Sequence, residues 1–144
     1  NLIKKSLDLT KLTSKNSINL INNTQKQLIN GDEDQLNRVF INLIKNSEES
    51  FLEQMQKDPN FKGIIDIEIV SNNDYIFIRI TDNGTGIIDA KKAMTPYFTT
   101  KKTGTGLGLP IVTKIINEHS GNFSIKNRLD KKGSIVTITL PKYA

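Results

Sequence analysis

The sequence predicts a two-layer α/β sandwich in which about three helices cover one face of a mixed, mainly antiparallel sheet. Three observations support this fold class. Strand patterns occur in pairs joined by short turns, longer patterns of helical period separate the pairs, and no internal repeat is present. With 144 residues the chain is long enough to bury a core of its own, so we expect residues 1–144 to form a single domain.

The amino-terminal elements are short. Leucine and isoleucine at mixed spacing predict a helix over residues 1–10. Residues 16–22 and 25–29 predict the two strands of a hairpin, because Asn22-Asn23 is a turn signal and Asn30-Gly31 closes the second strand.

The longest helical pattern covers residues 34–56, with Asp32 in the N-cap position. Its apolar face carries Leu36, Phe40, Leu43 and Phe51, flanked by Val39 and Ile44. Asn42 and Asn46 lie one turn apart, so their amides project in the same direction. Because asparagine is mildly unfavourable inside a helix, the pair suggests an inward-facing polar site. The alternative is that both side chains are simply solvated.

Two alternating strands follow, over residues 65–69 and 76–80, with Asn72-Asn73-Asp74 as the turn between them. The second strand leads directly into a loop that carries Asp82 and then glycines at 84 and 86. An acidic side chain followed by alternating glycines suits close approach of a ligand, while a polar turn is the alternative.

The carboxyl-terminal part begins with residues 88–102, which lack periodicity and predict a lid-like segment. A helix over residues 107–119 follows and stops at Ser120-Gly121. Residues 122–127 and 133–140 then predict a final hairpin. Its buried face is expected to carry Phe123, Ile125, Val136, Ile138 and Leu140.

The segment that enters this last helix reads Gly104-Thr105-Gly106-Leu107-Gly108. Glycines let the backbone approach a bulky ligand, and the helix N-terminus presents unpaired N–H groups that favour a phosphate. Pro110 fits the first turn of the helix. The pattern is neither a P-loop, since no Gly-Lys-Ser/Thr follows, nor the dinucleotide fingerprint, which needs glycine at Leu109.

Composition excludes other classes of site. No cysteine and a single histidine exclude disulfides, thiolate metal sites and His-rich metal sites. No apolar run approaches the ~18–20 residues of a membrane-spanning helix. The formal net charge is +5, but the lysines are scattered, which favours a solvated surface over a nucleic-acid-binding patch.

Three polar segments follow one another along the chain: the helix with Asn42 and Asn46, the loop with Asp82, and the glycine-rich segment 104–108. Taken together in this order, they resemble the ATP-binding domain of sensor histidine kinases, from the superfamily of gyrase, Hsp90 and MutL. FINLIKNSEES is similar to the N box, TDNGTGI to the G1 box, and PYFTTKKTGTGLGLPIV to the F box, lid and G2 box. The lid and GTGLGL are most similar to those of nitrogen-regulation sensor kinases. The resemblance covers residues 31–140 and implies an ATP lid over residues 87–103.

The resemblance implies a role for each matching residue. Asp82 would accept a hydrogen bond from the adenine amino group, and Gly84 and Gly86 would let the backbone pass close to the base and lid. Asn46 would bind Mg²⁺ through its amide oxygen, a ligand type that Mg²⁺ accepts. The cofactor-binding set from the lid and G2 box is Phe98, Lys101, Lys102, Gly104, Thr105, Gly106, Leu107 and Gly108.

Asn42 occupies the place where hydrolysing relatives carry a glutamate that activates water. An amide cannot act as a base at neutral pH, so the resemblance implies phosphoryl transfer rather than hydrolysis. The catalytic set is therefore Asn42, Asn46 and Lys101, with Lys102 as the alternative lysine for the γ-phosphate.

Three positions depart from the family pattern. Thr95 stands where many relatives have glutamate, and Ser47 and Ser50 replace alanines that are common in the N box. We expect none of these changes to touch a proposed ligand atom. His119, near the end of the last helix, is expected to be structural rather than a phosphoacceptor.

The resulting hypothesis is a domain that binds MgATP and donates the γ-phosphate to a histidine on a separate dimerisation domain of a two-component sensor kinase. The chain begins at Asn1 inside a helical pattern, so we expect a piece of a longer protein, with residues 1–10 as the end of a linker. Expected partners are that dimerisation domain, in a full-length homodimer, and a response-regulator receiver domain. We expect no nucleic acid and no direct membrane contact.

We expect this domain to lie in the cytoplasm. The sequence does not decide whether the parent protein is anchored in the bacterial inner membrane. The alternatives are an ATPase clamp of the gyrase, Hsp90 and MutL kind, a non-catalytic pseudokinase, and a basic nucleic-acid-binding module.

Overall fold

The computed structural model describes residues 17–22, 32–86 and 108–142. The elements in these ranges are strand β1 (Ser17–Asn22), helix α2 (Glu33–Lys57), strands β2 (Ile64–Ser71) and β3 (Tyr75–Asp82), helix α4 (Gly108–Glu118), and strands β4 (Asn122–Asn127) and β5 (Ser134–Pro141). The helix expected over residues 1–10, the strand over 25–29 and the lid over 87–103 lie outside the described residues. Neither of the two described helices has the length and apolar content of a membrane span.

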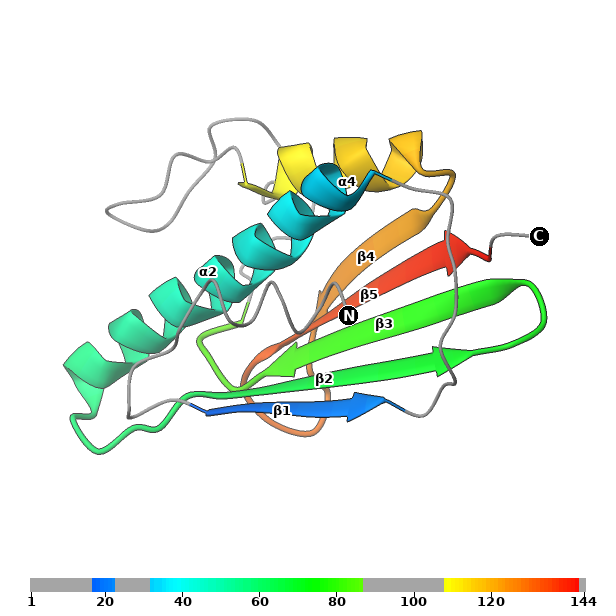
Figure 1. The fold of residues 1–144 in the computed structure, drawn as a ribbon. Coiled ribbons are helices and arrows are strands. Elements are labelled where there is room, and N and C mark those ends of the chain that lie inside the picture. The colour runs from blue at the N-terminus through cyan, green and yellow to red at the C-terminus, as the bar shows by residue number, and fades with distance from the viewer. Residues whose placement is uncertain (1–16, 23–31, 87–107, 143–144) are drawn as a thin grey trace.

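The strands form one sheet in the order β1-β2-β3-β5-β4. β1 runs parallel to β2, and every other neighbouring pair is antiparallel. Both α2 and α4 lie on the same side of this sheet (Figure 1). The prediction of a two-layer sandwich with a mixed, mainly antiparallel sheet is therefore confirmed. The predicted hairpin partner of β1 falls outside the described residues, and within them β1 pairs with β2.

The turn between β2 and β3 follows from Asn72. Its side-chain Oδ1 accepts hydrogen bonds from the backbone N–H groups of Asp74 (2.9 Å) and Tyr75 (2.8 Å), and its own N–H donates to the Tyr75 carbonyl (3.0 Å). Asparagine mimics a backbone turn in this way, so the turn closes without glycine. The alternating isoleucines of both strands are thereby placed on one face of the sheet.

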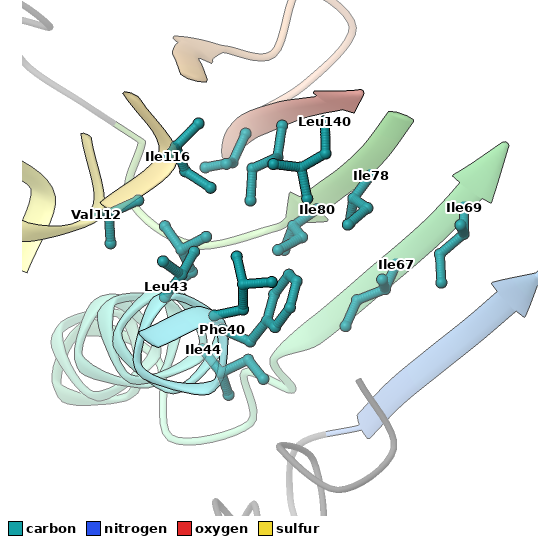
Figure 2. Packing of buried hydrophobic residues seen from close by; sticks show 14 of the residues in the cluster. Phe40, Leu43, Ile44, Ile67, Ile69, Ile78, Ile80, Val112, Ile116 and Leu140 are labelled. Carbon is teal, nitrogen blue, oxygen red and sulfur yellow. The ribbon is translucent and has the colours of Figure 1, made fainter. Parts of the chain in front are cut away.

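The hydrophobic core lies between this face and the two helices (Figure 2). The sheet contributes Ile65, Ile67, Ile69, Ile76, Ile78, Ile80, Val136, Ile138 and Leu140, and the helices contribute Leu36, Val39, Phe40, Leu43, Ile44, Phe51, Val112, Ile115 and Ile116. Each such side chain contributes roughly 1.5–3 kcal/mol when it leaves water. Phe123 and Ile125, which were expected on the buried face, are only partly buried because β4 is an edge strand.

Helix α2 begins as predicted at Asp32. The Asp32 carboxylate accepts hydrogen bonds from the N–H groups of Asp34 (2.9 Å) and Gln35 (3.2 Å), which satisfies two of the free donors at the helix start. The N–H of Asp32 itself donates to Nε2 of His119 (3.0 Å). His119 therefore connects the end of α4 to the start of α2.

This contact fixes the protonation pattern of the imidazole. Because Nε2 of His119 accepts a hydrogen bond, it carries no proton, and Nδ1 then donates to the Ile115 carbonyl at 2.8 Å. Nε2 thus joins the end of α4 to the start of α2, while the Nδ1 hydrogen bond lies within the last turn of α4 and orients the ring. The geometry gives His119 the structural role that we expected.

Replacing His119 by Ala should lower the free energy of unfolding by about 1 kcal/mol, the usual worth of a lost hydrogen bond. Urea denaturation of the variant and of Lys114→Ala, an exposed position on the same helix, measures the difference. An unfolding midpoint unchanged by His119→Ala would contradict this role.

Helix α4 ends just before Ser120-Gly121, as predicted. Ser120 takes the left-handed conformation with φ of 59°. Gly121 then donates its N–H to the Ile116 carbonyl at 2.9 Å. Glycine is needed at 121 for space, because a Cβ there would meet the carbonyl oxygen of Thr139.

Candidate functional site

The centre of the site is Asp82, the last residue of β3. It is 6% exposed, and its carboxylate accepts four hydrogen bonds. Oδ1 accepts from the N–H groups of Gly84 (3.0 Å) and Ser134 (3.2 Å), and Oδ2 accepts from the hydroxyls of Ser47 (2.8 Å) and Ser134 (3.0 Å). A buried carboxylate needs such donors, because an unpaired charge in the interior is costly.

These four donors come from three parts of the chain. Ser47 belongs to α2, Gly84 to the loop after β3, and Ser134 to the start of β5. Because Ser47 directly follows Asn46, its hydrogen bond ties the turn of α2 that carries Asn46 to the end of β3. The structure thereby brings together two of the predicted segments, the N box and the G1 box.

A second serine of α2 holds the loop after β3. Ser50, 7% exposed, accepts a hydrogen bond from the N–H of Thr85 at 2.6 Å, and the two hydroxyls of Ser50 and Thr85 lie 2.9 Å apart. Gly84 makes this packing possible, since a Cβ at that position would collide with Ser50 Oγ and lie 2.9 Å from Ser50 Cβ. Close packing of the loop against α2 therefore explains why position 84 needs a residue without a Cβ.

Gly86 has a backbone reason of its own. Its φ is +81°, a conformation that side chains with a Cβ rarely adopt, and a Cβ there would lie 2.7 Å from Oδ1 of Asn127. Asn83 anchors the other side of the loop, accepting from the N–H of Ile64 (2.7 Å) and donating to the Lys62 carbonyl (3.0 Å). The loop after β3 is thus held from both sides.

The β4–β5 turn packs against the backbone of Asp82. Nη1 of Arg128 donates to the Asp82 carbonyl at 3.3 Å, while Nε and Nη2 of Arg128 donate to the two oxygens of Asp130. The hydrogen bond from Arg128 lowers the pKa of Asp130 below its usual value. Gly133 has a φ of +134°, and a Cβ there would overlap the Asp82 carbonyl oxygen.

The two asparagines of the helix, Asn42 and Asn46, are half-buried and lie on one flank of α2. On the opposite flank, burial raises the pKa of Glu48, while Lys45 opposes the rise and Glu49 adds to it. Oε1 of Glu48 is buried and has no hydrogen-bond partner among the described residues. Since positions 46 and 48 are separated by about 200° around a helix, Glu48 belongs to a different surface from Asn46.

One expectation about this site was wrong. Ser47 was expected to touch no proposed ligand atom, but its hydroxyl donates directly to Asp82. Ser50 contacts the adjoining loop instead. The sequence carried a signal, since two small polar residues stood at positions where alanine is common. What it lacked was the long-range contact between residues 47 and 82.

Sequence reasoning also missed Arg128, Gly133 and Ser134, which were taken only as part of a turn and strand. By contrast, the predicted residues Phe98, Lys101, Lys102, Gly104, Thr105, Gly106 and Leu107 lie outside the described residues. Gly108 is the first residue of α4, and Pro110 lies in its first turn as predicted.

Comparison with known proteins identifies the family. Residues 31–144 match the family described as histidine kinase-, DNA gyrase B-, and HSP90-like ATPase. The chain belongs to this family. The matched range contains α2, the loop after β3 and α4.

Two relatives illustrate the similarity. Sporulation kinase C of Bacillus subtilis is 39% identical over 116 residues, covering 79% of this chain and 25% of the relative. A putative NtrY-like sensor histidine kinase of Rickettsia conorii is 39% identical over 109 residues, covering 74% of this chain and 17% of the relative. NtrY-like kinases are thus among the relatives, in agreement with the predicted resemblance. The chain spans a quarter or less of the length of these proteins.

Solved structures confirm the fold. The mycobacterial sensor histidine kinase MprB superposes with a TM-score of 0.80 at 22% identity, covering 98% of this chain and 92% of that one. Full-length ShkA in complex with AMPPNP superposes with a TM-score of 0.78 at 19% identity, covering 99% of this chain and 30% of that one.

Proposed function

We propose that this chain binds MgATP at the Asp82 loop and donates the γ-phosphate to a histidine on a separate dimerisation domain. The observation that carries the proposal is the buried Asp82 carboxylate, tied to the helix turn that bears Asn46. The relatives named as sensor kinases and the AMPPNP complex of ShkA support it. The proposed reaction class is protein histidine kinase.

In this proposal, Asp82 accepts a hydrogen bond from the adenine amino group. An ionised carboxylate only accepts hydrogen bonds, so it favours adenine over guanine, which presents an oxygen at the same place. Gly108 and the N-terminus of α4 bind phosphate oxygens, together with Gly104, Thr105, Gly106 and Leu107. Lys101 or Lys102 contacts the γ-phosphate, and Phe98 anchors the lid.

The described residues fit a magnesium ion that the nucleotide carries. They contain no group of three carboxylate, histidine or cysteine side chains able to hold a metal by themselves. Mg²⁺ is commonly held by one or two protein oxygens together with waters and phosphate oxygens, and Asn46 offers such an oxygen. When bound, the ion neutralises charge on the phosphates.

Asn42 decides between transfer and hydrolysis. It lies one turn before Asn46 on the same flank of α2, where its amide can orient a group but cannot remove a proton from water. Phosphoryl transfer needs mainly positioning and charge neutralisation, so a nucleophile supplied by another domain suffices.

A transfer assay tests this proposal. The chain is incubated with γ-³²P-ATP, Mg²⁺ and a separate dimerisation domain that bears an acceptor histidine. We expect acid-labile label on the dimerisation domain and none on the chain alone. Stable label on the isolated chain, or steady release of phosphate without a partner, would contradict the proposal, and the second outcome would favour an ATPase clamp.

Asn46→Ala should remove most of the Mg²⁺-dependent gain in nucleotide affinity, with an expected loss of at least about tenfold. Calorimetric titration measures the nucleotide affinity with and without Mg²⁺. The loss should appear only in the presence of Mg²⁺. Lys45→Ala, at the adjacent exposed position, is the control and should keep the full effect of Mg²⁺. Equal Mg²⁺ dependence in Asn46→Ala and wild type would exclude Asn46 as the ligand.

The remaining partners belong to the same proposal. The parent protein acts as a homodimer, passes phosphate to a response-regulator receiver domain and works in the cytoplasm. These assignments concern the whole protein and are proposals, since the chain spans a quarter or less of the length of these relatives.

A further inference from the structure

The Asp82 carboxylate has no acceptor position left over. Two carboxylate oxygens offer about four lone-pair positions, and four donors already occupy them. An adenine amino group can therefore reach this carboxylate well only if one of these donors gives way.

The two oxygens differ in how easily they can be vacated. Oδ1 is bound by the backbone N–H groups of Gly84 and Ser134, whose positions are fixed by the loop and by β5. Oδ2 is bound by two hydroxyls, which can rotate about single bonds. The amino group is therefore expected to bind at Oδ2.

The two hydroxyls on Oδ2 are not equivalent. Ser134 is bound to Asp82 twice, through its N–H and its hydroxyl, and lies in the sheet. Ser47 is bound once, and it lies inside α2, where a serine hydroxyl can turn to the carbonyl four residues earlier. That carbonyl belongs to Leu43 and has a second lone pair beyond its helical hydrogen bond.

We propose that Ser47 is a specificity-determining residue whose hydroxyl competes with the adenine amino group for Oδ2 of Asp82. This inference rests on the proposed function, because it assumes that Asp82 receives the base. In the structure Ser47 donates to Asp82 and stabilises the buried charge. When adenine binds, the Ser47 hydroxyl turns to the Leu43 carbonyl, and the amino group takes its place.

This exchange has a measurable consequence. When ATP binds, the hydrogen bond between Ser47 and Asp82 breaks. The cost of breaking it offsets part of the binding free energy that the amino group contributes. In Ser47→Ala that competitor is gone, and any water that replaces it exchanges more readily. Ser47→Ala should therefore bind ATP about three- to fivefold more tightly than wild type, the scale of one net hydrogen bond.

The decisive comparison uses ATP and purine riboside triphosphate, which differs from ATP only in lacking the 6-amino group. Calorimetry gives the dissociation constants of both nucleotides for the 144-residue chain and for Ser47→Ala. We expect the preference for ATP over the purine analogue to rise about three- to fivefold in Ser47→Ala. A residue that merely supports the fold would change both constants by the same factor.

Ser50→Ala is the matched control. It removes a buried hydroxyl one turn along the same helix, and that hydroxyl holds the same loop without contacting Asp82. Its effect should be equal for the two nucleotides, so the preference for ATP should keep the wild-type value. Ser47→Cys, which retains only a weak donor, should raise the preference less than Ser47→Ala does.

The possible outcomes separate this inference from the proposed function. If wild type binds neither nucleotide, the proposed function fails. If wild type prefers ATP but Ser47→Ala shows the same preference or a smaller one, the proposed function stands and the competition by Ser47 is excluded.

Discussion

Replacing Asp82 by Asn should weaken the binding of adenine nucleotides by about a hundredfold, the upper end of the worth of one hydrogen bond to a charged acceptor. An amide has only one oxygen, so its NH₂ group would face donors in place of an acceptor. The Oδ1 side faces the N–H groups of Gly84 and Ser134, which can only donate, and the Oδ2 side faces the hydroxyls of Ser47 and Ser134, which would have to turn in order to accept. The geometry around the base would change along with the charge.

The same substitution should lower the free energy of unfolding by about 2–4 kcal/mol, because buried donors lose their acceptor. Binding is therefore measured by calorimetry at a temperature where circular dichroism shows both proteins folded. Asp74→Asn, the same change in the exposed β2–β3 turn, is the matched control and should bind nucleotide as wild type does. Nucleotide affinity within a few-fold of wild type in Asp82→Asn would remove Asp82 from the site.

Gly133→Ala should be the most damaging single methyl group that can be added around Asp82. The φ of Gly133 is +134°, and the new Cβ would overlap the Asp82 carbonyl oxygen and lie 2.9 Å from Cδ of Arg128. The obstacle is backbone, which cannot turn aside as a flexible side chain can. We expect a loss of about 3 kcal/mol or more in unfolding free energy, with a parallel loss of nucleotide affinity.

Urea denaturation of Gly133→Ala measures the first of these effects. Lys132→Ala, at the preceding exposed position of the same turn, is the control and should lie within about 0.5 kcal/mol of wild type. A Gly133→Ala variant as stable as Lys132→Ala would show that the turn adapts and that this glycine does not hold the site in place.

The elements with strong local signals could be predicted from the sequence. Asp32 caps α2 through its side chain, and the alternating isoleucines form β2 and β3. Such features depend on residues within a few positions of one another. The start of α4 could also be predicted, because Gly108 and Pro110 are residues that the first turn of a helix tolerates.

Long-range pairing was harder to predict. The sequence analysis did not predict that β1 pairs in parallel with β2, which follows the whole of α2. The hairpin predicted for β1 stays a prediction, because its second strand lies outside the described residues. Alternation shows which face of a strand is buried but not which strand lies beside it. Partly buried β4 illustrates the same limit, since its edge position is a property of the sheet.

The site shows a similar division. Asp82 and Asn46 stand in recognisable motifs, but the donors that hold Asp82 do not. Ser47 is 35 positions away in the sequence and Ser134 is 52 away. A serine looks alike whether it is solvated or donates to a buried carboxylate, so only the fold identifies these two as part of the site.

The central claim is that the chain binds MgATP by contacting both the adenine base and the Mg²⁺ ion. Calorimetry on the wild-type chain tests this claim most directly. A non-hydrolysable ATP analogue is titrated with and without Mg²⁺, and the corresponding GTP analogue is titrated in parallel. We expect saturable binding of the adenine nucleotide with a stoichiometry near one, strengthened by Mg²⁺, and much weaker binding of the guanine nucleotide. A folded chain that binds neither nucleotide, or binds both equally well, would contradict the claim.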